Sequence, residues 1–271
     1  MNRASRPTRF PLGLDRVVVK APEARATDPI RPQRPLQEAA ADARRQALPT
    51  GVGLDSAGVR TRMVSRLRAE GVADEIVLSA IASVPRHAFV DTALVVQAYE
   101  DTSLPIGHGQ TISKPSVVAR MLSLLMASPY TRARGHLGRV LEIGTGCGYQ
   151  AALLSHLGRH VVSIERLRPL HHKARELLEP FRRHNVRLVY GDGRVGHAPN
   201  APYDSIIAAA GGDELPQSWL DQLAVGGRLV APMEGSHGKG QVLMVVDRFE
   251  SDWIRSVHEA VNFVPLKSGI A

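Results

Sequence analysis

A glycine-rich turn in the middle of the chain is the segment best suited to holding a ligand. The stretch VLEIGTGCGYQAA, residues 140–152, runs from an apolar segment through Gly144, Gly146 and Gly148 into a helix-forming sequence. Glycines at these positions permit a tight turn and let a ligand lie against the backbone at a helix N-terminus. This spacing alone is also compatible with an ordinary tight turn between a strand and a helix.

Acidic residues around the turn indicate which ligand it holds. Glu142 precedes Gly144 by two positions, Glu165 follows Gly144 by 21 positions, and Asp192 lies in a later GDG sequence. A carboxylate at the Glu165 position can accept hydrogen bonds from ribose hydroxyls. A dinucleotide site has the spacing G-x-G-x-x-G around a pyrophosphate, whereas this turn has G-x-G-x-G and a carboxylate, Glu142, that repels phosphate. The pattern therefore favours S-adenosylmethionine (AdoMet), which carries a cationic amino acid portion, over the dinucleotide of a dehydrogenase.

Strands and helices alternate from Gly138 onward, and these elements must position the turn. Apolar strands are expected at residues 139–143, 160–164, 186–190, 203–209, 228–232, 241–247 and 254–262, with helices at 149–157, 167–181 and 216–223. This alternation predicts an α/β fold with a doubly wound, mostly parallel, Rossmann-like sheet that has helices on both faces. No helix separates the last two strands, so we expect antiparallel edge strands at the C-terminus. Because parallel strands end at one edge, Glu165 and Asp192 should lie in one crevice with the turn.

The segment before the sheet has a different pattern. Helices are expected at residues 62–70 and 74–84 and from Pro115 to about Ala127. Residues 86–113, between them, are rich in glycine and proline, and we interpret this stretch as an ordered functional loop. Gly226 and Gly227 are expected to close the helix over 216–223.

Charge and proline are unevenly distributed along the chain. The protein has 271 residues and a net charge of +8, and residues 1–56 contain 10 basic residues, 6 acidic residues and 7 of the 18 prolines. This composition predicts a disordered, basic Pro/Arg-rich arm over 1–56 and a folded domain over 57–271. Such an arm could contact nucleic acid or an acidic partner, but nucleic acid is not expected as the main partner.

Several classes of protein and site are disfavoured by composition. No apolar run approaches the roughly 20 residues of a membrane span, and we expect no secretory signal, because the N-terminal residues have no apolar h-region. The single cysteine, Cys147, fits a reducing compartment, so we expect a cytoplasmic protein. No HExxH or other metal-ligand pattern is present, and no metal is expected.

Several further segments resemble the protein-L-isoaspartate O-methyltransferase family. The matching stretches are PRHAFV (85–90), AYEDTSLPIGHGQTIS (98–113), VLEIGTGCGYQAA (140–152), GDGRVG (191–196), APYDSII (201–207), QLAVGGRLVAP (222–232) and VNFVPL (261–266). They follow in order over about residues 60–268, and the GQTIS and FVPL elements are peculiar to this family. The resemblance implies a monomeric AdoMet-dependent methyltransferase that acts on the α-carboxylate of L-isoaspartyl residues in damaged proteins and so allows their repair.

The resemblance also implies roles for individual residues. Ser113 in GQTIS would be the catalytic serine, whose hydroxyl orients the acceptor carboxylate; a simple helix N-cap is the alternative. Together with the turn, the expected cofactor-binding residues are Lys114, Pro115, Ser116, Val117, Glu142, Ile143, Gly144, Gly146, Glu165, Arg166, Asp192 and Gly193. The expected substrate-binding residues are Thr111, Ile112, Val264, Pro265, Leu266 and Ser268. A peptide α-carboxylate has a pKa of about 3.5, so no general base is required.

Two alternatives keep part of this interpretation. The fold could serve a different acceptor, such as a small carboxylate or RNA, or the chain could be a non-catalytic module that binds nucleic acid or a partner through the arm. Lys114 and Lys267 depart from the family pattern and add positive charge near the expected site. They could attract an acidic substrate, slow its attack by stabilising the carboxylate, or point into solvent.

Overall fold

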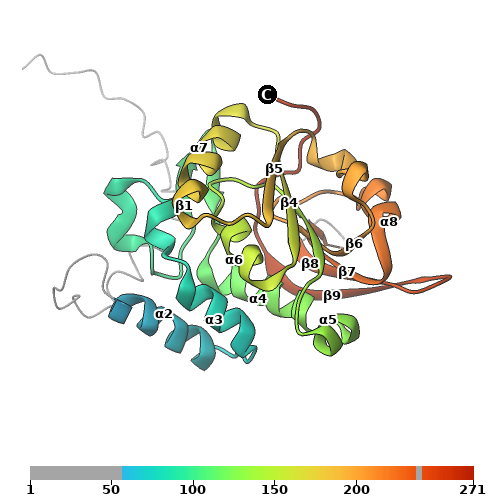
Figure 1. Ribbon diagram of the computed structural model, residues 1–271, viewed down its shortest axis with the longest axis horizontal. Coiled ribbons are helices and arrows are strands. Elements are labelled where there is room, and N and C mark those ends of the chain that lie inside the picture. Colours follow the sequence, from blue (N-terminus) through green and yellow to red (C-terminus); the bar gives the residue numbers. More distant parts are fainter. Residues whose placement is uncertain (1–56, 236–239) are drawn as a thin grey trace, which may run out of the picture. The chain divides into compact units, whose positions relative to one another are not determined.

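A twisted sheet forms the centre of the fold. The computed structural model describes residues 57–235 and 240–271. Within them, seven strands pair in the order β5–β4–β3–β6–β7–β8–β9. Figure 1 shows strands of this sheet with helices beside them. The strands are β3 (Arg139–Ile143), β4 (His160–Glu165), β5 (Val186–Tyr190), β6 (Tyr203–Ala208), β7 (Leu223–Glu234), β8 (Gln241–Arg248) and β9 (Trp253–Val261). The pairs from β5 to β7 are parallel, and β8 is antiparallel to both its neighbours, so the expected fold class is confirmed.

The continuous apolar character of the strands follows from burial on both faces. In β3, Val140 packs into one apolar cluster with the helices α3 (Glu75–Ser83), α4 (Pro115–Met126) and α6 (Tyr149–Leu157), whereas Leu141 and Ile143 belong to a second cluster on the opposite face. Successive side chains of a strand point to opposite faces, so both sets must be apolar when both faces are covered. The second face is covered by α8 (Gln217–Gln222), which contributes Trp219.

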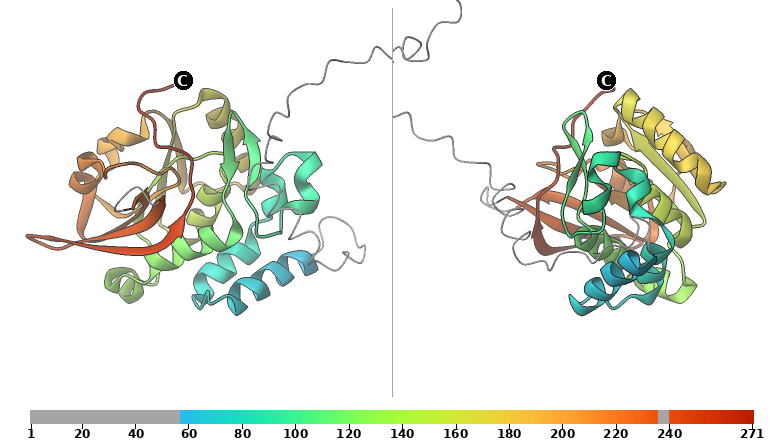
Figure 2. Two further views of the ribbon diagram at one scale, coloured as in Figure 1. Left: turned by 180° about the vertical axis from the view of Figure 1, so that it is seen from behind. Right: turned by 90° about the vertical axis from the view of Figure 1, so that its left-hand side faces the viewer.

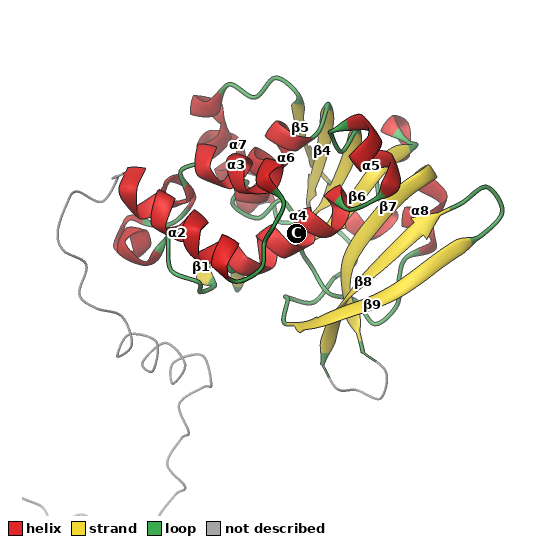
Figure 3. Ribbon diagram, turned by 90° about the horizontal axis from the view of Figure 1, so that it is seen from below, coloured by secondary structure: helices red, strands yellow, loops and turns green. Residues whose placement is uncertain are grey.

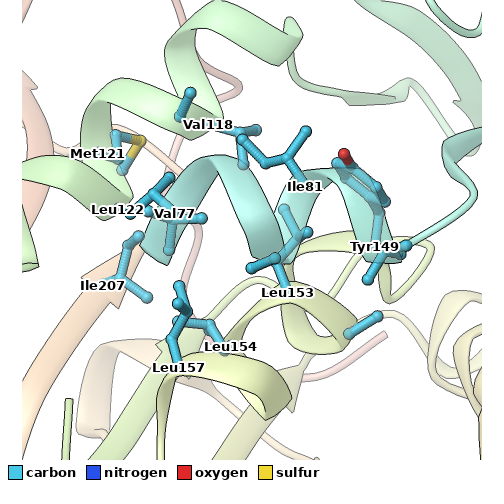
Figure 4. Packing of buried hydrophobic residues seen from close by; sticks show 14 of the residues in the cluster. Val77, Ile81, Val118, Met121, Leu122, Tyr149, Leu153, Leu154, Leu157 and Ile207 are labelled. Atoms are coloured by element: carbon cyan, nitrogen blue, oxygen red, sulfur yellow. The ribbon is translucent and has the colours of Figure 1, made fainter. Parts of the chain in front are cut away.

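The larger of the two cores contains apolar residues of the helices α2 (Ala57–Ala69), α3 (Glu75–Ser83), α4 (Pro115–Met126), α6 (Tyr149–Leu157) and α7 (Arg168–Leu178). The short helix α5 (Pro129–Arg134) lies between α4 and β3 in the chain. Figure 4 shows Val77 and Ile81 of α3 between the side chains of α4 and those of α6. Asp74 begins α3 by accepting hydrogen bonds from the N–H groups of Ile76 (3.0 Å) and Val77 (3.1 Å), which fixes the start of the helix.

The stretch over 86–113, expected as a loop, contains short regular elements. They are the 3₁₀ helices η2 (Arg86–Phe89) and η3 (Thr92–Gln97) and an antiparallel hairpin of β1 (Leu104–Gly107) and β2 (Gln110–Ile112). His108 and Gly109 have φ values of 53° and 68° at the turn of the hairpin, the left-handed backbone that a two-residue hairpin turn requires. Further 3₁₀ turns are η4 (Glu179–Phe181), η5 (Gly193–Val195) and η6 (Ala198–Asn200).

One expected boundary is wrong. Gly226 and Gly227 do not close the helix before them, because they lie inside β7, which begins at Leu223 directly after α8. The pairing of β6 with β7 jumps between Tyr203↔Leu223 and Ser205↔Arg228, so the residues between form a bulge. Glycines occur in a bulge as they do in a turn, so Gly226 and Gly227 resembled the end of a helix in the sequence although they lie in a strand. Figure 3 shows the antiparallel ribbon that β8 and β9 add beyond β7.

The structure describes only one of the two expected domains. The predicted arm, residues 1–56, lies outside the described residues. The described residues belong to one compact unit over Gly51–Ala271.

Candidate active site

A cavity of about 200 Å³ opens at the carboxyl ends of the parallel strands. From β3 the chain continues to β4 and β5 on one side and returns to β6 on the other side, so the strand order reverses between β3 and β6. Open α/β sheets bind ligands at this point. The expected site residues that line the cavity are Thr111, Ile112, Ser113, Ile143, Gly144, Gly146, Glu165, Arg166, Gly193, Val264, Pro265 and Leu266.

The glycine turn forms the floor of the cavity against the β1–β2 hairpin. Gly146 has a φ of 56°, and a Cβ atom built there would lie 3.2 Å from Cδ1 of Ile106 in the hairpin. A larger residue at this position would therefore be strained and would press on the hairpin. The hydroxyl of Thr145 lies 2.6 Å from that of Ser163 in β4, which ties the turn to the next strand.

Glu165 lies at the end of β4 with both carboxylate oxygens directed at the glycine turn and its own loop. Oε2 accepts a hydrogen bond from the N–H of Gly146 (2.9 Å), and Oε1 accepts one from the N–H of Leu167 (2.8 Å). Burial raises the pKa of Glu165, and these backbone hydrogen bonds oppose the rise. Each carboxylate oxygen can accept a second hydrogen bond. The side chain lines the cavity, so it can accept hydrogen bonds from ribose hydroxyls there.

Glu142 lies beneath the turn, and it does not line the cavity. It is fully buried, and its Oε2 accepts a hydrogen bond from Ser163 at 2.5 Å. Burial raises the pKa of Glu142 to about 8, so the group is mainly uncharged at neutral pH. From the sequence, we expected a charged carboxylate beside the cofactor. Its role in cofactor binding stays a prediction.

The polar atoms beside the turn fit a cofactor with an amino acid portion. Among the described residues, Oε1 of Glu142 and Nε2 of Gln150 are buried and have no partner within ordinary hydrogen-bond geometry, but the Gln150 amide lies close enough to the Glu142 carboxyl group to oppose the rise of its pKa. Gln150 also lines the cavity, although the sequence analysis did not select it. No local sequence pattern marks Gln150 as a residue of the cavity. Gln150 and Glu165 thus supply polar groups at two places in the cavity wall, where AdoMet can bind.

Ser113 lies between β2 and α4 and reaches the cavity from the hairpin side. The N-cap residue of α4 is Lys114, and no side chain caps the helix from that position. Instead, the carboxylate of Asp101 accepts hydrogen bonds from the N–H (2.8 Å) and the hydroxyl (2.7 Å) of Ser116. The alternative role of Ser113 as an N-cap is therefore wrong. The sequence analysis missed Asp101, although it lies within the quoted stretch 98–113.

The segment after β9 covers the cavity from the side opposite the turn. Gly211 donates its N–H to the carbonyl of Val264 (2.8 Å) and accepts a hydrogen bond from the N–H of Leu266 (2.7 Å). This pairing places the substrate-binding segment that we expected against the loop after β6. Figure 2 shows this last part of the chain beside the β1–β2 hairpin. The side-chain oxygen of Gln241 supports this segment by accepting a hydrogen bond from the N–H of Phe263 (2.7 Å).

Two expected residues, Asp192 and Ser268, bind other parts of the chain. The carboxylate of Asp192 accepts hydrogen bonds from the N–H groups of Arg194 (2.8 Å) and Gly269 (2.5 Å). Arg166 donates from Nε to the carbonyl of Gly269 (2.8 Å) and from a terminal nitrogen to that of Ser268 (3.4 Å). Neither Asp192 nor Ser268 lines the cavity. Their ligand contacts stay predictions.

The start of α4 also lies outside the cavity wall. Lys114 is exposed, and Pro115 is buried at the first position of the helix. Ser116 and Val117 line a separate hollow. These four residues form the segment directly after Ser113, and their contacts with a cofactor stay predictions. Lys267, in contrast, lines the cavity, as does His108 in the turn of the hairpin.

The fold and the cavity define a class of protein. A glycine turn after the first parallel strand, an acidic residue at the end of the second and a crevice at the reversal of strand order are the features of an AdoMet-dependent methyltransferase. Solved structures agree. A protein-L-isoaspartate O-methyltransferase aligns with a TM-score of 0.68 at 28% identity, over 77% of this chain and 66% of that chain. A structure from Plasmodium falciparum, in complex with S-adenosyl-L-homocysteine, shares the fold with a TM-score of 0.67 at 23% identity, over 77% of this chain and 98% of that chain.

The chain belongs to the protein-L-isoaspartate(D-aspartate) O-methyltransferase family, whose model matches residues 59–271. A protein-L-isoaspartate O-methyltransferase from Methylibium petroleiphilum is 62% identical and is covered over 99% of both chains. Another from Burkholderia vietnamiensis is 57% identical over 83% of this chain and 71% of its own. The expected family and cofactor are confirmed. The protein is an enzyme of AdoMet-dependent methylation of L-isoaspartyl residues, a reaction of protein repair.

Two further observations concern only the described residues. No helix among them combines the length and the apolar character that a membrane crossing needs. Nor do three or more His, Cys, Asp or Glu side chains gather there in an arrangement that could hold a metal ion.

Proposed function

We propose that Ser113 orients the acceptor, the α-carboxylate of an L-isoaspartyl residue, while the glycine turn and Glu165 hold AdoMet in the same cavity. The observation that carries this proposal is the meeting of three separate segments around one cavity. Ser113 comes from the hairpin side, Glu165 from the end of β4, and Val264–Leu266 from the segment after β9. A transfer reaction needs a donor site and an acceptor site that share one space.

AdoMet, when bound, supplies an electrophilic methyl group on a positively charged sulfur. The protein does not need to remove a proton from the acceptor, because a peptide carboxylate with a pKa of about 3.5 is already an anion. The hydroxyl of Ser113 can donate a hydrogen bond that orients this anion without neutralising it. Glu165 and the backbone at Gly146 are placed to bind the adenosine portion, and Gln150 is placed to bind the amino acid portion.

Exclusion of water is the second contribution of the protein. Ile112, Ile143 and Leu266 give the cavity an apolar wall on three sides. An anion and a cation neutralise each other in the reaction, so a site with little water favours the transition state over the separated charges. Lys267, at the same wall, adds a positive charge that can attract the anionic acceptor.

The substrate peptide is proposed to lie along Val264–Leu266 in an extended conformation. Thr111 is exposed at the opposite wall of the cavity and is proposed to contact the same peptide. Recognition through the peptide backbone needs few specific side chains. This suits an enzyme that acts on damaged sites in many different proteins.

The test measures methyl transfer from radiolabelled AdoMet to matched peptides, one isoaspartyl and one aspartyl. Base-labile label is expected on the isoaspartyl peptide alone. The Ser113→Ala variant should weaken this transfer, whereas Ser83→Ala, at the exposed end of α3, should not. Equal labelling by Ser113→Ala and the control would contradict the role of the serine. No transfer to either peptide, despite binding of S-adenosyl-L-homocysteine, would point to another acceptor, with small carboxylates and RNA next.

We further propose that residues 57–271 form the catalytic domain and that the enzyme acts as a cytoplasmic monomer without nucleic acid. The family match from residue 59 onward supports the boundary, and the single cysteine supports a reducing compartment. A chain without residues 1–56 should therefore keep its transfer rate. Salt-dependent retention on DNA that this deletion removes would assign a nucleic-acid function to the arm.

A further inference from the structure

Arg86, in the PRHAFV stretch, is a buried cation that the proposed reaction does not yet use. Its side chain lies in η2 and is fully buried. Among the described residues it forms no ion pair. Burial lowers its pKa, because removal from water disfavours the charged form. An arginine held in such a place needs other compensation for the water that it has lost.

The compensation comes from backbone carbonyl groups of the stretch that leads to Ser113. The Nε of Arg86 donates to the carbonyl of Ala98 (2.8 Å), and a terminal nitrogen donates to the carbonyl of Ser113 (2.8 Å) and, more weakly, to that of Thr102 (3.5 Å). Without Arg86, these three carbonyl groups would lose the hydrogen bond that it donates to them. One planar guanidinium thus holds three points of the chain that lie up to 27 positions away in sequence.

The same guanidinium also contacts the cofactor side of the cavity. Its Cζ lies 5.0 Å from the centre of the Tyr149 ring, at the distance of a cation–π contact. Tyr149, labelled in Figure 4, is the first residue of α6 and directly follows the glycine turn at Gly148. Arg86 therefore touches both the backbone of the serine and the helix that begins at the cofactor turn.

We propose that Arg86 is a positioning residue that sets the distance between Ser113 and the cofactor turn. The inference rests on the proposed function. In-line transfer tolerates little displacement, and an error of about 1 Å can reduce a rate about 10²-fold. Lysine cannot replace this arginine, because a point charge cannot bind three carbonyls in one plane and stack on a ring at once.

The experiment compares Arg86→Met and Arg86→Lys with Arg228→Met. Arg228 is a matched control, because it also donates to a backbone carbonyl, that of Leu124 (2.8 Å), and its side chain is only 13% exposed. It differs in that it pairs with Asp247, and neither residue lines the cavity. The single-turnover rate is measured at saturating isoaspartyl peptide and divided by the number of sites that bind S-adenosyl-L-homocysteine. This division removes the effect of any misfolded fraction.

Both Arg86 variants are expected to lose about 10²-fold in rate per site, while the control keeps the wild-type rate. Affinity for S-adenosyl-L-homocysteine should change much less than the rate. A rate per site equal to that of the control would overturn the proposal. So would loss of S-adenosyl-L-homocysteine binding in both Arg86 variants, because that result would assign Arg86 to folding alone.

Amide hydrogen exchange gives a readout that does not depend on the acceptor. With S-adenosyl-L-homocysteine bound, residues 110–116 should exchange faster in Arg86→Lys than in the wild type or in Arg228→Met. Unchanged protection would overturn the proposal. If the wild type fails to methylate the isoaspartyl peptide, the proposed function fails, and the exchange measurement still decides the role of Arg86.

Discussion

Replacement of Glu142 by glutamine tests whether a buried, uncharged acid lies beneath the cofactor turn. Glu142 is fully buried, one of its oxygens accepts a hydrogen bond from Ser163, and the side chain of Gln150 also interacts with its carboxyl group. Burial raises its pKa from 4.5 to about 8. Glutamine has nearly the same shape and resembles the protonated acid, so Glu142→Gln removes the titration without removing the side chain.

The sign of the effect follows from the direction of the pKa shift. In the folded protein the group keeps its proton up to a pH of about 8, whereas the unfolded chain releases it near pH 4.5. The stability that Glu142 contributes is therefore fully present below pH 4.5 and is lost as the pH rises through 8. Between pH 5 and pH 8 the wild type should lose about 3 kcal/mol through this group. The glutamine variant should not lose it.

The assay is urea unfolding of both proteins at several pH values between 5 and 8. The difference in free energy of unfolding should move in favour of Glu142→Gln by about 3 kcal/mol over this range. Glu176→Gln, at an exposed position on α7, serves as the control and should follow the wild type. Parallel curves for the wild type and Glu142→Gln would refute the reasoning, since they would mean that Glu142 is ionised in the folded protein.

Three further predictions concern the walls of the cavity. Glu165→Gln should weaken S-adenosyl-L-homocysteine binding about 10- to 100-fold, as measured by calorimetry. The variant loses the charged acceptor, and in either orientation of the amide its N–H group faces the backbone N–H of Gly146 or of Leu167. An affinity within twofold of the wild type would contradict this. Gly193→Ala places a Cβ 2.5 Å from Cγ2 of Ile143, so we expect a loss of about 1–3 kcal/mol in unfolding free energy together with weaker cofactor binding. Wild-type stability of that variant would show that the wall yields without strain. Burial raises the pKa of Cys147 to about 11, so the native thiol should resist a disulfide reagent at pH 8 and react after unfolding. Immediate labelling of the native protein would argue against this.

Much of the fold is predictable from local patterns. The strands β3 and β5 have the predicted bounds. In β3 the signal is clear, because residues 140–143 are buried on both faces and three of the four are apolar. The absence of a helix between β8 and β9 correctly indicated antiparallel strands. The hairpin over 104–112 was not foreseen, because a pair of strands of four and three residues has too little periodicity to distinguish it from a loop.

The composition of the cavity wall was only partly predictable. The glycine turn, Glu165 and Ser113 belong to short motifs whose chemistry is visible in their own residues. Gln150 and Arg86 were missed because their significance depends on what they touch, and those contacts come from distant segments. Trp219 is another case: its indole N–H donates to the carbonyl of Gly193 at 2.8 Å and holds the cavity wall from α8.

The sequence by itself determined the class of fold, the cofactor and the family, because strand periodicity, the glycine turn and the motif set are properties of short segments. Only the tertiary structure decided which of the expected residues share one cavity. Asp192 meets the N–H of Gly269 across 77 positions of sequence, and Arg86 meets the carbonyl of Ser113 across 27. The protonation state of Glu142 was also decided there. Burial and hydrogen bonding depend on every segment that packs against a group, and no local pattern contains them.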